Sequence, residues 1–305
     1  MDASAANGDR EGLRRYAALI ERALRAAPPT FAPPTFVPTA ESCGTIQLER
    51  GVAYALLVGD PSSPVERIAE LLDPWADVTL APSAVVDRAG HRRPGYRGLL
   101  FHAAFRAIAL AGVGRVGPIA TRWVGMLRVQ LASLRWPGHP AGAIPADRGA
   151  AVADAVWMAL AAHGAAAVEE NASWRNLAAE TFARLVSCQH PRGTFLTAGR
   201  SDNPEAHWYH ELVLLQAATA YAAQTGDPSL AAAVARNAAH HQDETQPDHA
   251  TNQPWGLAAF AWNRATRPLA DQVLHAAATI GASGITSILL ADALYSLRLL
   301  TPRDA

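Results

Sequence analysis

From residue 99 to residue 300 the chain is a series of apolar segments, each long enough for a helix and with its apolar residues at helical spacing. None of these segments alternates apolar and polar residues convincingly, as a half-buried strand would. Helices are predicted at 99–113, 117–134, 148–163, 172–188, 204–225, 228–242, 254–265, 268–279 and 284–300. Such segments bury their apolar faces by packing helix against helix, which predicts an all-α domain.

Capping residues mark several of the predicted helix ends. Asp227 before Pro228 places an N-cap residue ahead of a first-turn proline, which predicts a helix start. Gly164 and Gly226 follow apolar segments, so both are predicted as the glycines that terminate helices.

The N-terminal part of the chain has a different character. Apolar residues at helical spacing predict a helix over 11–27, and it ends at Pro28. Residues 28–36 then repeat the sequence PPTF twice, which excludes a helix and favours an extended polyproline form. We expect an arm lying across the body, or alternatively a ligand for an SH3-like partner. The predicted division is 1–40, N-terminal helix and Pro-rich arm, and 41–305, a single domain.

Composition excludes several classes of function. Half of the residues are apolar, enough for a substantial core, and the formal charge is −1 with 17% charged residues. Neither a nucleic-acid-binding surface nor a polybasic membrane patch is expected from this balance. All 26 basic residues are Arg, so Schiff-base chemistry and a P-loop lysine are also excluded.

The remaining compositional signals concern cysteines, localisation and metals. Cys43 and Cys188 are too few for a disulfide framework or a four-cysteine zinc site. The polar N-terminus lacks a signal-peptide core, and no run of about 18 apolar residues follows it, so we expect a cytoplasmic protein. His240, His241, Asp243, Glu244 and His249 lack the spacing of a known metal motif, and we expect neither a metal nor another cofactor. The oligomeric state is not predicted.

The connections between helices differ in kind. Those near 90–98, 135–147, 189–203 and 243–253 are longer or richer in polar and aromatic residues than the others. Alternate connections of an up-and-down helix array fall at the same end, so the four rich loops are predicted to form one rim.

One segment carries a family resemblance. It ends a predicted helix at Phe182–Cys188 and turns through Gln189, Gly193 and Phe195. This segment resembles the QW repeat of terpenoid-cyclase-like α/α toroids, with Phe195 where Trp is usual. In that family the Gln satisfies groups at the helix end, and the aromatic ring packs between successive hairpins. The resemblance implies an α/α toroid, an incomplete or irregular barrel, over residues 99–300.

The resemblance does not bring the cyclase reaction with it, because the sequence contains neither a D-x-D-D nor a D-D-x-x-D motif. The rhythm of helix pairs is also similar to that of polysaccharide lyases and six-hairpin glycosidases. Those proteins act on glycans with carboxylates, His, Tyr and Asn.

The densest polar group opens the predicted helix at 204–225. His207 and Glu211 are four residues apart and share a helix face, and a His beside a carboxylate is a common general base. Tyr209 could donate a proton. The catalytic residues predicted in this group are His207, Tyr209, His210 and Glu211. Alternatively, these side chains satisfy the helix end and interhelical hydrogen bonds.

A second polar group lies at 243–255 and is richer in acids, amides and histidine than a simple turn requires. Asp248 and His249 are predicted to face His207 across one cavity, as further catalytic residues. The alternative is a loop that holds itself together by Asx-type hydrogen bonds.

Arginine and aromatic residues gather in or beside the same loops. Arg binds carboxylates through paired hydrogen bonds, and Trp rings suit stacking on sugars. The predicted substrate-binding residues are Arg97, Arg148, Arg200, Asn203, Trp208, Asn252 and Trp255.

Together these features favour the hypothesis of a carbohydrate-active α/α-toroid enzyme that acts on an acidic glycan at the rim. A lyase would use His207 or His210 as the base near C5 of a uronic acid, with Tyr209, Asn203 and an Arg beside it. A hydrolase would use two acids, for which Glu211 and Asp248 are the predicted pair. The alternative from another class is a non-catalytic toroid or helical-repeat protein that binds a small molecule, a glycan or a protein.

Three structural expectations accompany this hypothesis. Phe195 should be inserted between hairpins, and the loops before residues 204 and 254 should lie at the same end because the turn at 225–228 is tight. Residues on the apolar stripes should be buried between helices, namely Trp157, Leu185, Leu212, Leu215, Phe260 and Leu294.

Overall fold

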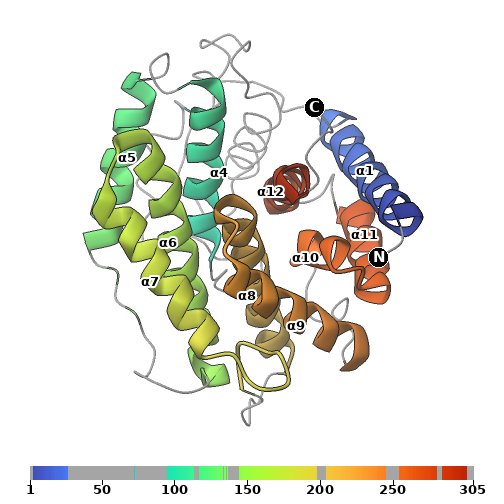
Figure 1. Ribbon diagram of the computed structural model, residues 1–305. Coiled ribbons are helices and arrows are strands. Elements are labelled where there is room, and N and C mark those ends of the chain that lie inside the picture. The colour runs from blue at the N-terminus through green and yellow to red at the C-terminus, as the bar shows by residue number, and fades with distance from the viewer. Residues whose placement is uncertain are drawn as a thin grey trace.

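The computed structural model describes residues 3–26, 72, 95–112, 117–132, 134, 136, 144–197, 204–244, 254–279 and 284–300. This part of the chain is all-α and contains no strand apart from one isolated bridge between Ile144 and Leu196. The helices are α1 (Ala3–Ala26), α4 (Tyr96–Ala111), α5 (Gly117–Ala132), α6 (Gly149–Glu169), α7 (Ala172–Ser187), α8 (Pro204–Thr225), α9 (Pro228–Glu244), α10 (Leu257–Trp262), α11 (Thr266–Thr279) and α12 (Gly284–Leu300), with a short 3-10 turn at Ala146–Arg148 (Figure 1).

Gly164 does not end a helix, contrary to the prediction. It lies inside α6, where a Cβ atom would sit 3.3 Å from the Cβ of Phe105 on α4. The missing side chain therefore serves the close approach of two helices. α6 continues to Glu169 and is terminated by Glu170, which adopts the left-handed conformation with φ 54°.

The helix predicted at 254–265 is shorter than expected. Pro254 and Trp255 lie in a turn that ends at Gly256, whose φ is 81°, and α10 begins only at Leu257. In contrast, the predicted cap at Asp227 is confirmed, since its Oδ1 accepts hydrogen bonds from the backbone N–H groups of Ser229 and Leu230 at 2.8 and 3.1 Å. Gly226 adopts φ 68°, as predicted for a helix-terminating glycine.

Four helices, α4, α6, α8 and α12, form an inner layer that is buried on nearly all sides. All residues of the stretches Leu99–Ala107 on α4 and Glu211–Ala222 on α8 are buried, as are most residues of α6 and α12. The predicted core residues are buried as well, each at most 2% exposed: Trp157, Leu185, Leu212, Leu215, Phe260 and Leu294.

Contacts along α4 and α6 show that these neighbours are parallel. Gly98 faces Trp157 so closely that a Cβ atom would collide with the α6 backbone, and seven residues further along both helices Phe105 faces Gly164. The sequence numbers rise together along the two helices, which defines a parallel pair.

The same reasoning extends to the other inner helices. Trp157 Nε1 donates to the carbonyl of Val213 at 3.1 Å, and further along both helices the rings of His163 and Tyr221 lie 5.0 Å apart. α6 and α8 are therefore parallel.

On the other side of α4, His102 contacts Asp292 and Arg106 contacts Tyr295 of α12. α12 is thus parallel to α4, and the N-terminal ends of α4, α6, α8 and α12 all point the same way.

The helices α5, α7, α9 and α11 lie outside this layer and bury one face each. α7, for example, buries Ala178, Thr181, Phe182 and Leu185 and exposes much of its remaining surface. The Phe182 ring stacks on Tyr221 of α8 with centroids 4.1 Å apart. Short connections, such as the turn at Gly226, join inner and outer helices as antiparallel hairpins.

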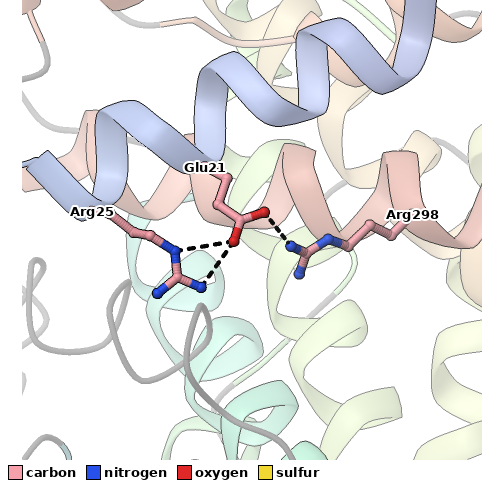
Figure 2. Close-up of polar contacts among 3 residues, drawn as sticks. All are labelled: Glu21, Arg25 and Arg298. Atoms are coloured by element: carbon pink, nitrogen blue, oxygen red, sulfur yellow. Dashed lines mark hydrogen bonds and ion pairs between the residues drawn. The ribbon is translucent and has the colours of Figure 1, made fainter. Parts of the chain in front are cut away.

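α1 packs on the outside of α12, where Ile20 and Leu24 are buried (Figure 1). At the edge of this contact the Glu21 carboxylate accepts hydrogen bonds from Arg25 Nε at 3.0 Å and Nη2 at 2.8 Å, and from Arg298 Nη2 at 2.7 Å (Figure 2). The hydrogen bond from Arg25 is the main reason that the pKa of Glu21 is lowered. Exposed ion pairs contribute little, so the buried apolar side chains carry most of this docking. The predicted Pro-rich arm lies outside the described residues.

Among the described helices, only α6, taken together with the 3-10 turn before it, is long and apolar enough to cross a membrane. Of its most apolar window, 67% is buried inside the protein.

Candidate functional site

The parallel inner helices bring several helix starts together at one end of the inner layer. The backbone N–H of Gly95, which precedes α4, donates to Asp154 Oδ1 of α6 at 2.6 Å. A Cβ atom on Gly149, the first residue of α6, would lie 2.8 Å from His210 Nδ1 of α8. The starts of α4, α6 and α8 therefore adjoin, and we call this region the N-terminal end of the inner layer.

An aromatic cluster consisting of Trp157, Tyr209, His210 and Trp255 lies at this end. The Trp255 ring centroid is 5.8 Å from that of Trp157 and 6.1 Å from that of Tyr209, and Tyr209 is 5.8 Å from His210. Trp255, two residues before α10, therefore lies beside the first turn of α8. That the loops before residues 204 and 254 lie at the same end stays a prediction. Three predicted site residues, Tyr209, His210 and Trp255, are brought together here.

Trp208 points elsewhere. Its ring centroid lies 6.2 Å from that of His240 and 5.9 Å from that of His241, both on α9. Trp208 thus packs between α8 and α9 and does not join the aromatic cluster.

Glu211 is fully buried, and both of its carboxylate oxygens are occupied. Oε1 accepts from the backbone N–H of Phe195 at 2.7 Å and from the Asn237 side chain, while Oε2 accepts from the N–H of Leu196 at 2.9 Å. Burial raises the pKa of Glu211 to about 7, although the three hydrogen bonds act in the opposite direction. The carboxylate therefore ties the 189–197 turn to α8 and α9.

The turn at 189–197 is a structural element, as the resemblance implied. Gln189 Nε2 donates to the carbonyls of Gly193 at 2.7 Å and Ala233 at 2.8 Å, and its Oε1 accepts from Arg236. Gly193 has φ 100°, and Phe195 is fully buried. Phe195 is thus buried as expected, and its insertion between successive hairpins stays a prediction.

The other predicted site residues are dispersed or lie outside the described part. Arg97 donates to Gln130 of the outer helix α5, and Arg148 is exposed in the 3-10 turn. The structure does not describe the side chains of the remaining predicted site residues, which are Arg200, Asn203, His207, Asp248, His249 and Asn252. The convergence of His207 with Asp248 and His249 remains a prediction.

A buried hydrogen-bonded network lies deeper in the inner layer. His102 Nε2 is 3.1 Å from Asp292 Oδ1, and Gln216 Nε2 donates to Asp292 Oδ2. Gln216 Oε1 in turn accepts from the backbone N–H of Gly256 at 3.3 Å. All three side chains have no exposed surface, and the network joins α4, α8, α12 and the turn before α10.

The protonation states within this network follow from its surroundings. Burial, together with the charge of Arg106, lowers the pKa of His102 to about 4 even though Asp292 acts to raise it. Burial alone would raise the pKa of Asp292, but the hydrogen bond from His102 leads the contributions that lower it. At neutral pH we therefore infer a neutral imidazole whose Nε2–H donates to an ionised carboxylate.

Arg106 lies one helical turn after His102 and is 4% exposed. Its guanidinium carbon sits 3.9 Å from the ring centroid of Tyr295, a cation–π contact. Burial lowers the pKa of Arg106, and the nearby Asp292 charge opposes this shift.

Sequence reasoning did not single out His102, Arg106 or Asp292. The signal available was that each is a polar residue inside an otherwise apolar helical run, at a position that the periodicity places in the core. Within the described residues, no cluster of three or more potential metal ligands occurs.

Comparisons with protein-family models, with curated proteins and with solved structures found no match to this chain.

Proposed function

We propose that the inner and outer helices form an α/α toroid. Two observations support this arrangement: the inner helices contact one another in succession from α4 through α6 and α8 to α12, with α10 against both α8 and α12, and α12 returns to contact α4. The turn through Gln189 and Phe195 adds support, since Gln189 bonds to the carbonyl of Ala233 on α9 and Phe195 is buried, as expected of a QW-like repeat.

We further propose that the protein is a carbohydrate-active enzyme that acts on an acidic glycan at the N-terminal end of the inner layer. The observation that carries this proposal is the meeting of the α4, α6 and α8 starts beside the aromatic cluster. Helix N-termini carry partial positive charge and favour carboxylates. Trp157 and Trp255 are fully buried, so within the cluster only the partly exposed Tyr209 and His210 are placed to contact a sugar ring, and the predicted binding role of Trp255 is not supported.

Between the two reaction types, the geometry favours the lyase. A hydrolase would need Glu211 as one of its two acids, but three donors already occupy this carboxylate. Tyr209 and His210 instead lie together at the N-terminal end, with ring centroids 5.8 Å apart. In the proposed reaction His210 accepts the proton from C5 of a uronic acid, and Tyr209 protonates the leaving oxygen.

The test is to incubate the purified protein with polysaccharides that contain uronic acids. Lyase activity would appear as ultraviolet absorbance of an unsaturated product, and hydrolase activity as reducing ends without that absorbance. Tyr209→Phe and His210→Ala should each lower kcat at least about 100-fold while circular dichroism is preserved. Tyr221→Phe is the matched control, because Tyr221 lies far along α8, beside Phe182, and should leave kcat unchanged.

A non-catalytic binding protein is the second candidate. It is favoured by the engagement of Glu211 and Arg97 in hydrogen bonds within the protein. Saturable binding of an acidic oligosaccharide without any product would support this candidate over the enzyme.

A further inference from the structure

Two side chains on the same face of α4 are buried without completing their hydrogen bonds. His102 and Arg106 are four residues apart and are 0% and 4% exposed. His102 Nδ1 and the three guanidinium nitrogens of Arg106 have no hydrogen-bond partner within the described part of the chain. A buried polar group without a partner is costly, and a buried charge is more so, which makes this pair the least satisfied part of the inner layer.

Asp292 does not satisfy Arg106. Its two oxygens face His102 and Gln216, and among the described ion pairs none joins Asp292 to the guanidinium. The negative charge of Asp292 stabilises Arg106 from a distance, while the Tyr295 ring covers one face of the guanidinium plane. The Tyr295 side chain also acts to raise the pKa of Arg106, yet no guanidinium nitrogen has a hydrogen-bond partner of normal geometry, so these N–H groups remain available to an acceptor.

His102 Nδ1 needs a hydrogen-bond donor, whereas the Arg106 guanidinium needs an acceptor. Because Nε2 carries the proton that is donated to Asp292, Nδ1 presents a lone pair and needs a donor. On α4 the guanidinium of Arg106 thus offers several N–H donors, and His102 Nδ1, one turn away, offers a single acceptor.

We propose that His102 and Arg106 form a binding site for a small hydroxy-carboxylic acid. The carboxylate accepts the paired N–H groups of Arg106, and the hydroxyl donates to His102 Nδ1. A monoanion fits better than a phosphate dianion, because Asp292 already places one negative charge within this low-dielectric site.

A ligand would reach the site past Tyr295. This side chain covers the guanidinium and is partly exposed, so we expect its displacement to admit a ligand to Arg106. His163 of α6 is also partly exposed, and the charge of Arg106 contributes to its lowered pKa after burial. Arg106 lies in the C-terminal half of α4, whereas His102 adjoins the aromatic cluster through Trp157, with ring centroids 5.9 Å apart. The proposed site does not depend on the proposed glycan reaction.

The experiment measures the melting temperature of the full-length protein against increasing glycolate, with propionate as a ligand of similar size that lacks the hydroxyl. Wild-type protein should show a saturable rise of Tm with glycolate, and propionate should bind at least about tenfold more weakly. Arg106→Met should abolish the response. Arg106→Lys, which keeps the charge but loses the fork, should bind more weakly than wild type.

Arg128→Gln is the matched control for unspecific binding to surface arginines, because Arg128 is exposed and paired with Glu169. Its response to glycolate should equal that of wild type. The proposal is overturned if glycolate gives no saturable rise in wild type, if the rise persists in Arg106→Met and Arg106→Lys, or if phosphate stabilises the protein and glycolate does not. A protein that binds glycolate through Arg106 but cleaves no glycan would refute the proposed lyase and leave this site standing.

Discussion

His102 and Asp292 are 190 positions apart in the sequence, yet His102 Nε2 lies 3.1 Å from Asp292 Oδ1 in the interior of the protein. This contact joins the first helix of the inner layer, α4, to the last, α12. Gln216 holds the second carboxylate oxygen from α8, so one carboxylate connects three inner helices.

Asp292→Asn should therefore destabilise the protein strongly. An amide offers one acceptor oxygen where the carboxylate serves two donors, and the positive charge of Arg106 would lose its nearest counter-charge. Leaving a buried donor without an acceptor typically costs about 1–3 kcal/mol, and more where a charged group is involved. Urea denaturation would measure the change, with Asp147→Asn as the control because Asp147 is exposed; equal stability of the two variants would contradict the assigned role.

Gly193→Ala should destabilise the protein more than Gly226→Ala. Both glycines adopt a positive φ, 100° and 68°, so alanine brings a backbone cost of about 1–2 kcal/mol at either position. A Cβ atom at Gly193 would in addition lie 2.5 Å from the carbonyl oxygen of Arg236, whereas one at Gly226 would meet nothing within 4 Å. Chemical denaturation of the two variants side by side would show whether the turn at 189–197 packs on α9 as described.

Phe195→Ala should lower the free energy of unfolding by about 3–5 kcal/mol, as expected for a fully buried aromatic ring. Val129→Ala, at a position that is 69% exposed, should change it by less than about 0.5 kcal/mol. Ligand affinity of the folded Phe195→Ala protein should remain near that of wild type. A small stability effect would argue against the structural role of this repeat-like turn.

The helices were predictable because their signal is local. The apolar residues of the segment 204–225 predicted the limits of α8 and the burial of Leu212 and Leu215, and a capping residue such as Asp227 acts within one turn. Gly164 was misjudged because its role depends on Phe105 of another helix, and no local signal separates a packing glycine from a terminating one.

The site was less predictable for the same reason. Glu211 and His207 share a helix face in the sequence pattern, but the donors that engage Glu211 come from the turn at 195–196 and from Asn237. His102 and Asp292 acquire their relationship only when α12 returns to α4. The proposed meeting of His207 with Asp248 and His249 still awaits a test.

The stability of wild-type protein should fall as pH drops from about 6.5 toward 4 through His102. Its folded-state pKa, about 4, is lower than the unfolded value of 6.5, so its contribution is complete above pH 6.5 and is lost as the unfolded chain takes up the proton. Arg106, Asp292 and His163 are the charged or titratable groups around it. Urea denaturation at several pH values should show a smaller acid-side loss in His102→Gln than in wild type.

Glu211 should act in the opposite direction on pH dependence. Its pKa is raised from 4.5 to about 7 in the folded protein, so its contribution is complete below pH 4.5, declines as pH rises and is lost above pH 7. The size of this contribution is on the order of a few kcal/mol.

Glu211→Gln removes the titrating group, and it also turns an amide N–H₂ toward the backbone donors of Phe195 and Leu196, so the variant should be less stable than wild type at every pH. Between pH 5 and pH 8, however, the variant should lose less stability than wild type, and the difference would be read from urea midpoints with the His102→Gln protein as a reference. Identical slopes in wild type and Glu211→Gln would show that burial does not hold a proton on this carboxyl, and the turn would then rest on an ionised Glu211.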